Sequence, residues 1–166
     1  MRRERPADAT AVRAVHAAAF DRGDGEPVEA GLVDALRLDG WLPALSLVAE
    51  RDGVLVGHSV CSRGRVGVTP CVGLGPIGVA PSEQGRGVGS ALMWAMIGAA
   101  DATGEPLIAL LGDPGYYRRF GFVASTDVGI EPPDPGWAHV FQVRTLAAWD
   151  PAIRGQFRYA APFDDV

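Results

Sequence analysis

The stretch that decides the fold of this chain is Val79-Ala-Pro-Ser-Glu-Gln84-Gly85-Arg86-Gly87-Val88-Gly89-Ser90. An apolar strand leads into a glycine-rich loop, and the helical run Ala91-Leu-Met-Trp-Ala-Met-Ile97 follows directly. Glycine has no Cβ, so it leaves the backbone N–H groups of the loop uncovered. These groups open a helix, where the first N–H groups lack partners and the helix dipole favours an anion. The stretch therefore predicts a binding site for a pyrophosphate.

Length and charge limit the classes of protein to consider. A chain of 166 residues fits one domain, and we expect residues 1–166 to form it. No apolar run is long enough to span a bilayer, and the charged start Met1–Arg5 lacks the apolar stretch of a signal peptide. We therefore expect a cytoplasmic protein without a membrane partner. The formal net charge of −5, without a basic tract, argues against a nucleic-acid partner.

Residue usage excludes two kinds of chemistry. All 15 basic residues are arginine, so neither a Schiff-base lysine nor a Walker-type phosphate loop is available. Cys61 and Cys71 sit in apolar, strand-like segments, and we expect them to be reduced core residues. Their spacing does not fit a metal knuckle, so no metal site is expected.

Local patterns predict an α+β fold, that is, a mixed α/β arrangement. Asp8 is expected to follow a short first strand and to cap the first helix. Asp52-Gly53 is a strong hairpin signal between two β-rich runs. The expected helices cover residues 9–20, 28–38, 91–103 and 115–120, and the later strands cover 45–51, 54–61, 72–79, 106–111, 122–125 and 138–143.

The strand before the glycine loop carries unusual residues for a sheet interior. Gly73, Gly75 and Gly78, together with Pro76, predict an irregular strand with a bulge. The same residues leave little side-chain bulk, so a ligand has room to lie against the backbone.

The order of elements and two motifs resemble the GNAT superfamily of acyl-CoA-dependent N-acetyltransferases. Gln84, Gly87 and Gly89 are similar to its pyrophosphate signature, Gln/Arg-x-x-Gly-x-Gly/Ala. Tyr117-Arg-Arg-Phe-Gly121-Phe122 is similar to its second element, a tyrosine four residues before a Gly-Phe pair. The resemblance covers nearly the whole chain. It implies a mixed, mostly antiparallel sheet of about six to seven strands, flanked by about four helices.

The resemblance also implies a cosubstrate, acetyl-CoA, and places it. In the family the fourth and fifth strands splay apart, and the pantetheine arm pairs with the fourth strand, here near Ile77, Gly78 and Val79. The pyrophosphate then lies on the N–H groups from Gly85 to Ser90. The implied cofactor-binding set also includes two arginines that would add positive charge, and Tyr116, which is expected mainly to pack. The full set is Ile77, Gly78, Val79, Gln84, Gly85, Arg86, Gly87, Val88, Gly89, Ser90, Gly112, Tyr116 and Arg119.

The implied reaction is the attack of a neutral amine of a small molecule or peptide on the thioester, in a ternary complex. Tyr117 occupies the position of the family's acid, and its ordinary pKa of about 10 suits protonation of a thiolate. The developing oxyanion needs an N–H donor, which the resemblance places on the fourth strand near Val79. The alternative interpretation is a non-catalytic CoA-binding sensor or interaction domain of the same fold.

A general base is not evident, because the segment Val72–Val79 holds no carboxylate. The candidates left open are His58, Glu26, Glu29, Asp113, Asp164 and Asp165, while an acceptor of low pKa needs none. Asp113 is expected to cap the short helix. The chain has Gly112-Asp113-Pro114 where the family more often has an asparagine turn, so asparagine contacts are not carried over.

The resemblance places the acceptor pocket at the segment Phe20–Glu29, Trp41 and the loop Pro132–Trp137. The acidic residues of these segments would suit a cationic amine; they are Asp21, Asp24, Glu26, Glu29 and Asp134. The alternative is that these loops are acidic only because they are exposed to solvent. The aromatic tail over 144–166 is expected to dock on the body of the chain or on a neighbouring subunit, which leaves a homodimer open. A dinucleotide fold is disfavoured, since about five residues separate Val79 from the first glycine of the loop.

Overall fold

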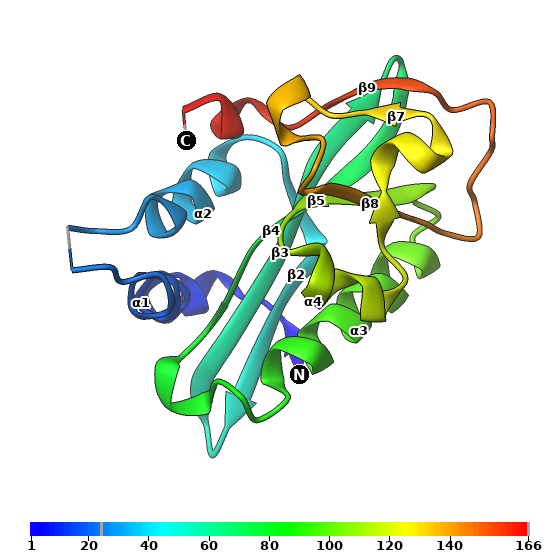
Figure 1. The fold of residues 1–166 in the computed structure, drawn as a ribbon. Coiled ribbons are helices and arrows are strands. Elements are labelled where there is room, and N and C mark those ends of the chain that lie inside the picture. Colours follow the sequence, from blue (N-terminus) through cyan, green and yellow to red (C-terminus); the bar gives the residue numbers. More distant parts are fainter. Residues whose placement is uncertain (24, 166) are drawn as a thin grey trace.

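The computed structural model describes residues 1–23 and 25–165 of the chain (Figure 1). Its α-helices are α1 (Ala9–Ala19), α2 (Val28–Leu38), α3 (Val88–Ala102) and α4 (Pro114–Tyr117). Its strands are β1 (Arg2–Arg3), β2 (Trp41–Arg51), β3 (Val54–Val66), β4 (Thr69–Val79), β5 (Leu107–Leu111), β6 (Val123–Ala124), β7 (Ile130–Glu131), β8 (Phe141–Thr145) and β9 (Gly155–Arg158).

The sheet is mixed and mostly antiparallel. Its strand order is β1-β2-β3-β4-β5-β8-β6, with β9 on β3 and β7 on β9. The pairings of β4 with β5 and of β7 with β9 are parallel, and the other pairings are antiparallel. The predicted α+β class is thus confirmed. The expected seven strands are present, and β7 and β9 are additional short strands of the described residues.

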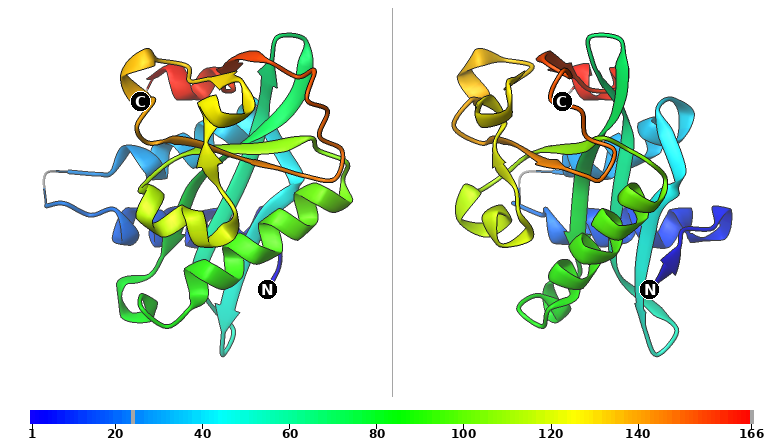
Figure 2. Two further views of the ribbon diagram at one scale, coloured as in Figure 1. Left: turned by 45° about the vertical axis from the view of Figure 1, so that its right-hand side comes forward. Right: turned by 90° about the vertical axis from the view of Figure 1, so that its right-hand side faces the viewer.

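Helices cover both faces of the sheet (Figures 1 and 2). On one face, Leu92, Met93 and Met96 of α3 form one apolar cluster with residues of β2, β3, β4 and β5. On the other face, Val12 of α1 and Leu36 of α2 pack against β2 and β3. The helix over 28–38 was predicted with its observed bounds, because its apolar residues recur at helical spacing.

The first residues of the chain form the predicted short strand, but Asp8 does not cap α1 with its side chain. Its carboxylate instead accepts from the N–H of Arg5 (2.7 Å) and from Arg2 (2.6 and 2.9 Å). These bonds hold β1 to the start of α1. The capping expected from the sequence is therefore wrong, because a nearby arginine takes the carboxylate.

The β3–β4 hairpin extends further than the local pattern predicts, through Val66 and Thr69. Its far part is covered by β9, which pairs Arg158 with Arg65 and Phe157 with Val66. Phe157 is fully buried in a cluster with Phe141 and Val143 of β8. The aromatic tail thus docks on the body of its own chain.

Two features of β4 shape the centre of the molecule. Its register with β3 shifts between the pairs Ser59–Ile77 and Cys61–Leu74, which places one extra residue on β4 and confirms the predicted bulge. Its pairing with β5 is confined, in the described chain, to Val72–Ile108 and Gly73–Ala109. Beyond Gly73 the two strands separate, while β5 stays paired with β8 as far as Leu111.

Cys61 and Cys71 are both buried and free, as expected. Burial raises the pKa of the Cys71 thiol to about 12 and raises that of Cys61 further. No helix of the described residues is long and apolar enough to cross a membrane.

Candidate active site

The glycine loop lies at the start of α3, where the sequence predicts an anion-binding site. Gly87 precedes Val88, the first residue of the helix, and the first helical N–H donation is from Ala91 to the Gly87 carbonyl (2.9 Å). Within residues 1–23 and 25–165, the N–H groups from Gly85 to Ser90 donate no hydrogen bond. Six adjacent donors at the positive end of a helix are thus available to a ligand.

Gly85 and Gly87 give the loop its shape. Their φ angles are +72° and +85°, a region that favours glycine. A Cβ built at either position has no atom within 4 Å, so both positions face open space. The loop therefore fits an anionic group that approaches the backbone closely.

Polar side chains hold the loop to its surroundings. The Gln84 amide donates to the Val79 carbonyl (3.0 Å), which ties the loop to the end of β4. Arg86 is exposed and lies 3.7 Å from Glu83, which also pairs with Arg51 (3.2 Å). The Arg86 guanidinium thus stays at the rim of the loop.

Residues of β4 and α4 meet beside this loop. Ile77 and Val79 pack on the same apolar cluster as Tyr116 and Tyr117. A Cβ on Gly89 would lie 3.3 Å from the Tyr116 hydroxyl, so that hydroxyl reaches the first turn of α3. The fold thus places the predicted residues of β4, α4 and the glycine loop next to one another.

Arg119 lies on the same corner of the molecule. Its guanidinium stacks over the Tyr116 ring at 4.7 Å, and its Nε donates to the Tyr116 carbonyl (2.9 Å). Its terminal nitrogens have no partner in the described part of the chain. A cation is therefore held against Tyr116 of α4, near the glycine loop.

Tyr117 is the last residue of α4, the helix that follows β5 in the chain. Its ring lies where a Cβ on Gly112 would be, so only glycine fits at that position. Burial, followed by the neighbouring Tyr116, raises the pKa of Tyr117 to about 12. The hydroxyl has no hydrogen-bond partner in the described chain and is not among its fully buried unpaired atoms. Tyr117 is thus a protonated phenol whose donor is free.

Asp113 acts as the expected cap of the short helix. Its carboxylate accepts from the N–H of Gly115 (2.8 Å) at the start of α4. This fixes the turn between β5 and Tyr117. Gly112, one residue earlier, donates its N–H to the Val140 carbonyl (3.0 Å) beside β8.

His58 is fully buried, so it cannot meet an acceptor directly. Its Nδ1 lies 2.7 Å from Nε2 of His16, and its Nε2 lies 2.9 Å from the Ser46 hydroxyl and 3.2 Å from the Glu4 carboxylate. Burial lowers the pKa of His58. The sequence analysis missed His16, although its position four residues after Val12 puts it on the buried face of α1.

The remaining base candidates differ in what holds them. Glu26 pairs with Arg13 (2.8 Å), and Glu29 lies 4.0 Å from Arg22. Both acids line a small cavity of about 220 Å³ at the loop between α1 and α2. Asp164 lines a separate, larger cavity. The side chain of Asp165 and the whole of Asp24 lie outside the described residues.

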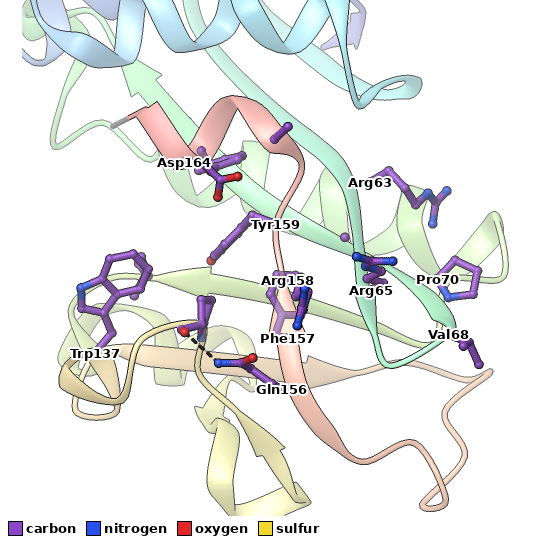
Figure 3. A pocket seen from close by; sticks show the side chains of 15 residues that line it. Arg63, Arg65, Val68, Pro70, Trp137, Gln156, Phe157, Arg158, Tyr159 and Asp164 are labelled. Atoms are coloured by element: carbon purple, nitrogen blue, oxygen red, sulfur yellow. Dashed lines mark hydrogen bonds between the residues drawn. The ribbon is translucent and has the colours of Figure 1, made fainter.

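The larger cavity, of about 780 Å³, lies between the β3–β4 hairpin, β9 and the C-terminal turn Ala161–Asp165 (Figure 3). Trp137 and Pro133 of the predicted acceptor loop line it. Trp41 does not, and instead packs against Leu32, Leu36 and Val60. Asp134 caps its own turn by accepting from Gly136 (2.7 Å).

Residues 13–122 match the Acetyltransferase (GNAT) family, and the chain belongs to this family of N-acetyltransferases. It is similar to the uncharacterized N-acetyltransferase YhbS of Escherichia coli, with 33% identity over 93% of this chain and 90% of YhbS. The uncharacterized N-acetyltransferase YjhQ of Escherichia coli is also 33% identical, over 93% of this chain and 88% of YjhQ.

Two solved structures share the fold over nearly the full length. The structure of Escherichia coli YhbS in complex with CoA has a TM-score of 0.89 and 32% identity, covering 98% of this chain and 90% of that one. A GNAT family acetyltransferase from Brucella melitensis in complex with acetyl-CoA has a TM-score of 0.78 and 38% identity, covering 98% of this chain and 96% of that one.

Proposed function

We propose that this single domain transfers an acetyl group from acetyl-CoA to an amine of a small molecule or peptide. The observation that carries the proposal is the separation of β4 from β5 beyond Gly73. The open N–H groups of the glycine loop come after the end of β4, and Tyr117 comes after the end of β5. The acetyl-CoA and CoA complexes of two similar proteins support the choice of cosubstrate.

The residues present fit this cosubstrate. The pantetheine arm lies along Ile77, Gly78 and Val79, whose backbone has no strand partner on the β5 side in the described chain. The pyrophosphate is held by the N–H groups from Gly85 to Ser90. Arg86 and Arg119 add positive charge at the rim, and Tyr116 closes the site beside Gly89.

In the transfer step the neutral amine attacks the thioester carbonyl, and the N–C bond forms as the C–S bond breaks. A β4 amide near Val79 stabilises the oxyanion. Tyr117 donates its proton to the departing thiolate, so CoA leaves as a thiol, and the proton that the attacking nitrogen loses passes through solvent back to the Tyr117 oxygen. Direct attack is favoured over an acyl-cysteine, because burial keeps both cysteines as thiols.

The test measures acetyl-CoA binding and thioester consumption separately. Calorimetry with acetyl-CoA, CoA and NAD(P) should show binding of the first two only. A free-thiol assay over a panel of amines should show turnover. Double-reciprocal plots of the initial rates should give intersecting rather than parallel lines, as a ternary complex requires. Binding of acetyl-CoA without turnover of any amine would favour the non-catalytic CoA-binding alternative, and binding of NAD(P) alone would contradict the proposed site.

A further inference from the structure

The cavity of about 780 Å³ shares no lining residue with the strand end and glycine loop assigned to acetyl-CoA. Its size lies within the usual range for small-molecule sites, about 300–1,000 Å³. Much of its lining comes from Trp137 and from β9 onward, beyond residue 122, where the family match ends. The β3–β4 hairpin and Leu111 supply the part of its lining that lies inside that match.

The cavity reaches the place where β4 and β5 separate. A Cβ on Gly73, the last residue of β4 paired with β5, would lie 2.6 Å from the Tyr159 ring. Leu111, the last residue of β5, also lines the cavity. An acceptor bound here is therefore close to the gap between the two strands.

The middle of the cavity suits an aromatic body. Tyr159 stacks on Phe163 with ring centroids 4.5 Å apart, and Trp137 is on the opposite side. The Tyr159 hydroxyl has no hydrogen bond within the described residues, and Figure 3 shows it pointing toward Trp137. A polar atom without a partner is thus directed into an aromatic space.

Two arginines of the cavity have no ion pair within the described residues, and Asp164 is the one carboxylate among its described lining residues. Arg65 and Arg158 are direct cross-strand partners of β3 and β9, and neither is within 4.0 Å of a described carboxylate. Arg63, in contrast, is satisfied by Glu105 through two bonds (2.7 and 2.8 Å). Like charges directly opposite each other destabilise a sheet, and a shared oxyanion relieves the repulsion.

We infer that the acceptor, if the proposed transfer is correct, is an amine with an aromatic body and an oxyanion such as a carboxylate or phosphate. Arg65 and Arg158 bind the oxyanion, Tyr159, Phe163 and Trp137 enclose the body, and the amine faces the gap between β4 and β5. Planar guanidinium groups suit both oxyanions.

The test uses product-like probes, so it does not depend on turnover. Calorimetry compares N-acetylphenylalanine with N-acetylphenethylamine, which lacks only the carboxylate, and includes phenyl phosphate. We expect the carboxylate to improve affinity about tenfold or more. The double variant Arg65→Gln/Arg158→Gln should remove this difference, whereas Arg3→Gln/Arg5→Gln, an equal charge change at two exposed positions near the start of the chain, should keep it.

The outcomes separate this inference from the proposed function. Equal affinity for both N-acetyl compounds, no binding of any probe, or a difference that persists in the double variant would overturn the inference. Tight phenyl phosphate binding with weak N-acetylphenylalanine binding would assign the oxyanion as phosphate. The affinity for acetyl-CoA should be unchanged in the double variant. If the wild type does not bind acetyl-CoA at all, the proposed function is contradicted instead.

Discussion

Nε2 of His16 lies 2.7 Å from Nδ1 of His58, in a contact that joins α1 to β3 inside the protein. The Glu4 carboxylate only accepts, so Nε2 of His58 carries a proton, and Nδ1 of neutral His58 accepts from His16. Nδ1 of His16 then has a lone pair and no partner in the described chain. Both rings are therefore held neutral, each in one tautomer.

This histidine pair predicts a loss of stability in mild acid. Burial, then His58 and Arg37, lower the pKa of His16 to about 3, and burial lowers that of His58, against an ordinary value of about 6.5. Below about pH 6.5 the unfolded chain binds protons that the folded chain does not. The free energy of unfolding should fall as pH drops from 7 to 5, by up to about 1.4 kcal/mol per pH unit for each histidine.

Urea unfolding at each pH measures this slope. His16→Gln, which keeps a donor toward His58, should reduce it by about half. His139→Gln, at an exposed position, should leave it unchanged. A free energy that is constant between pH 7 and 5 would show that the pair does not titrate on unfolding. Hydrogen bonds lower the pKa of Glu4 to about 2 despite its burial. Glu4 therefore affects stability only below this pH range.

Gly87→Val should abolish acetyl-CoA binding. A β-branched residue is strained at φ +85°, and its side chain enters the open space before α3. Gly104→Val is the matched control, because Gly104 has φ +77° and open space at the other end of the same helix. Calorimetry should show lost affinity for the first variant alone, while both lose similar stability. Retained affinity in Gly87→Val would remove the glycine loop from the site.

Tyr117→Phe should lower kcat about tenfold or more and leave the Kd for acetyl-CoA nearly unchanged, because only the proton donor is lost. Tyr116→Phe should instead raise the Kd for acetyl-CoA modestly and leave kcat nearly unchanged, because the Tyr116 hydroxyl lies beside Gly89. Steady-state kinetics with calorimetry separates the two effects. An unchanged kcat in Tyr117→Phe would mean that another group protonates the thiolate.

Phe157→Ala should destabilise the protein by about 3–5 kcal/mol, the usual cost of truncating a buried phenylalanine. The ring is fully buried against Phe141 and Tyr159 and joins β9 to the β3–β4 hairpin. Val68→Ala, at the exposed tip of that hairpin, serves as the control. Chemical denaturation checks both, and a loss under 1 kcal/mol in Phe157→Ala would show that β9 adds little to the fold.

The sequence predicts those features that local patterns encode. The α2 helix, the Asp52-Gly53 turn and the glycine loop each depend on neighbouring residues, and all three appear as expected. The bulge in β4 is also local, because it follows from Gly75 and Pro76. Most of the predicted cofactor residues therefore come together once these elements pack.

Other features depend on contacts between distant segments. The four residues of β9 have no strand pattern of their own and become a strand by pairing with Arg65 and Val66. His58 appears as a candidate base from its sequence, but its contacts with His16, Ser46 and Glu4 bury it. Arg65 and Arg158 likewise become neighbours only through the sheet, and no short-range pattern indicates this.

The separation of β4 from β5 gives the protein two facing sheet edges in its interior. Unpaired edges are normally places where another extended chain can add. Here the two edges belong to one fold and diverge from Gly73 and Ala109, so they cannot close on each other. In the proposed complex the pantetheine arm takes the place of a missing strand, so acetyl-CoA should slow the exchange of β4 amide hydrogens with solvent.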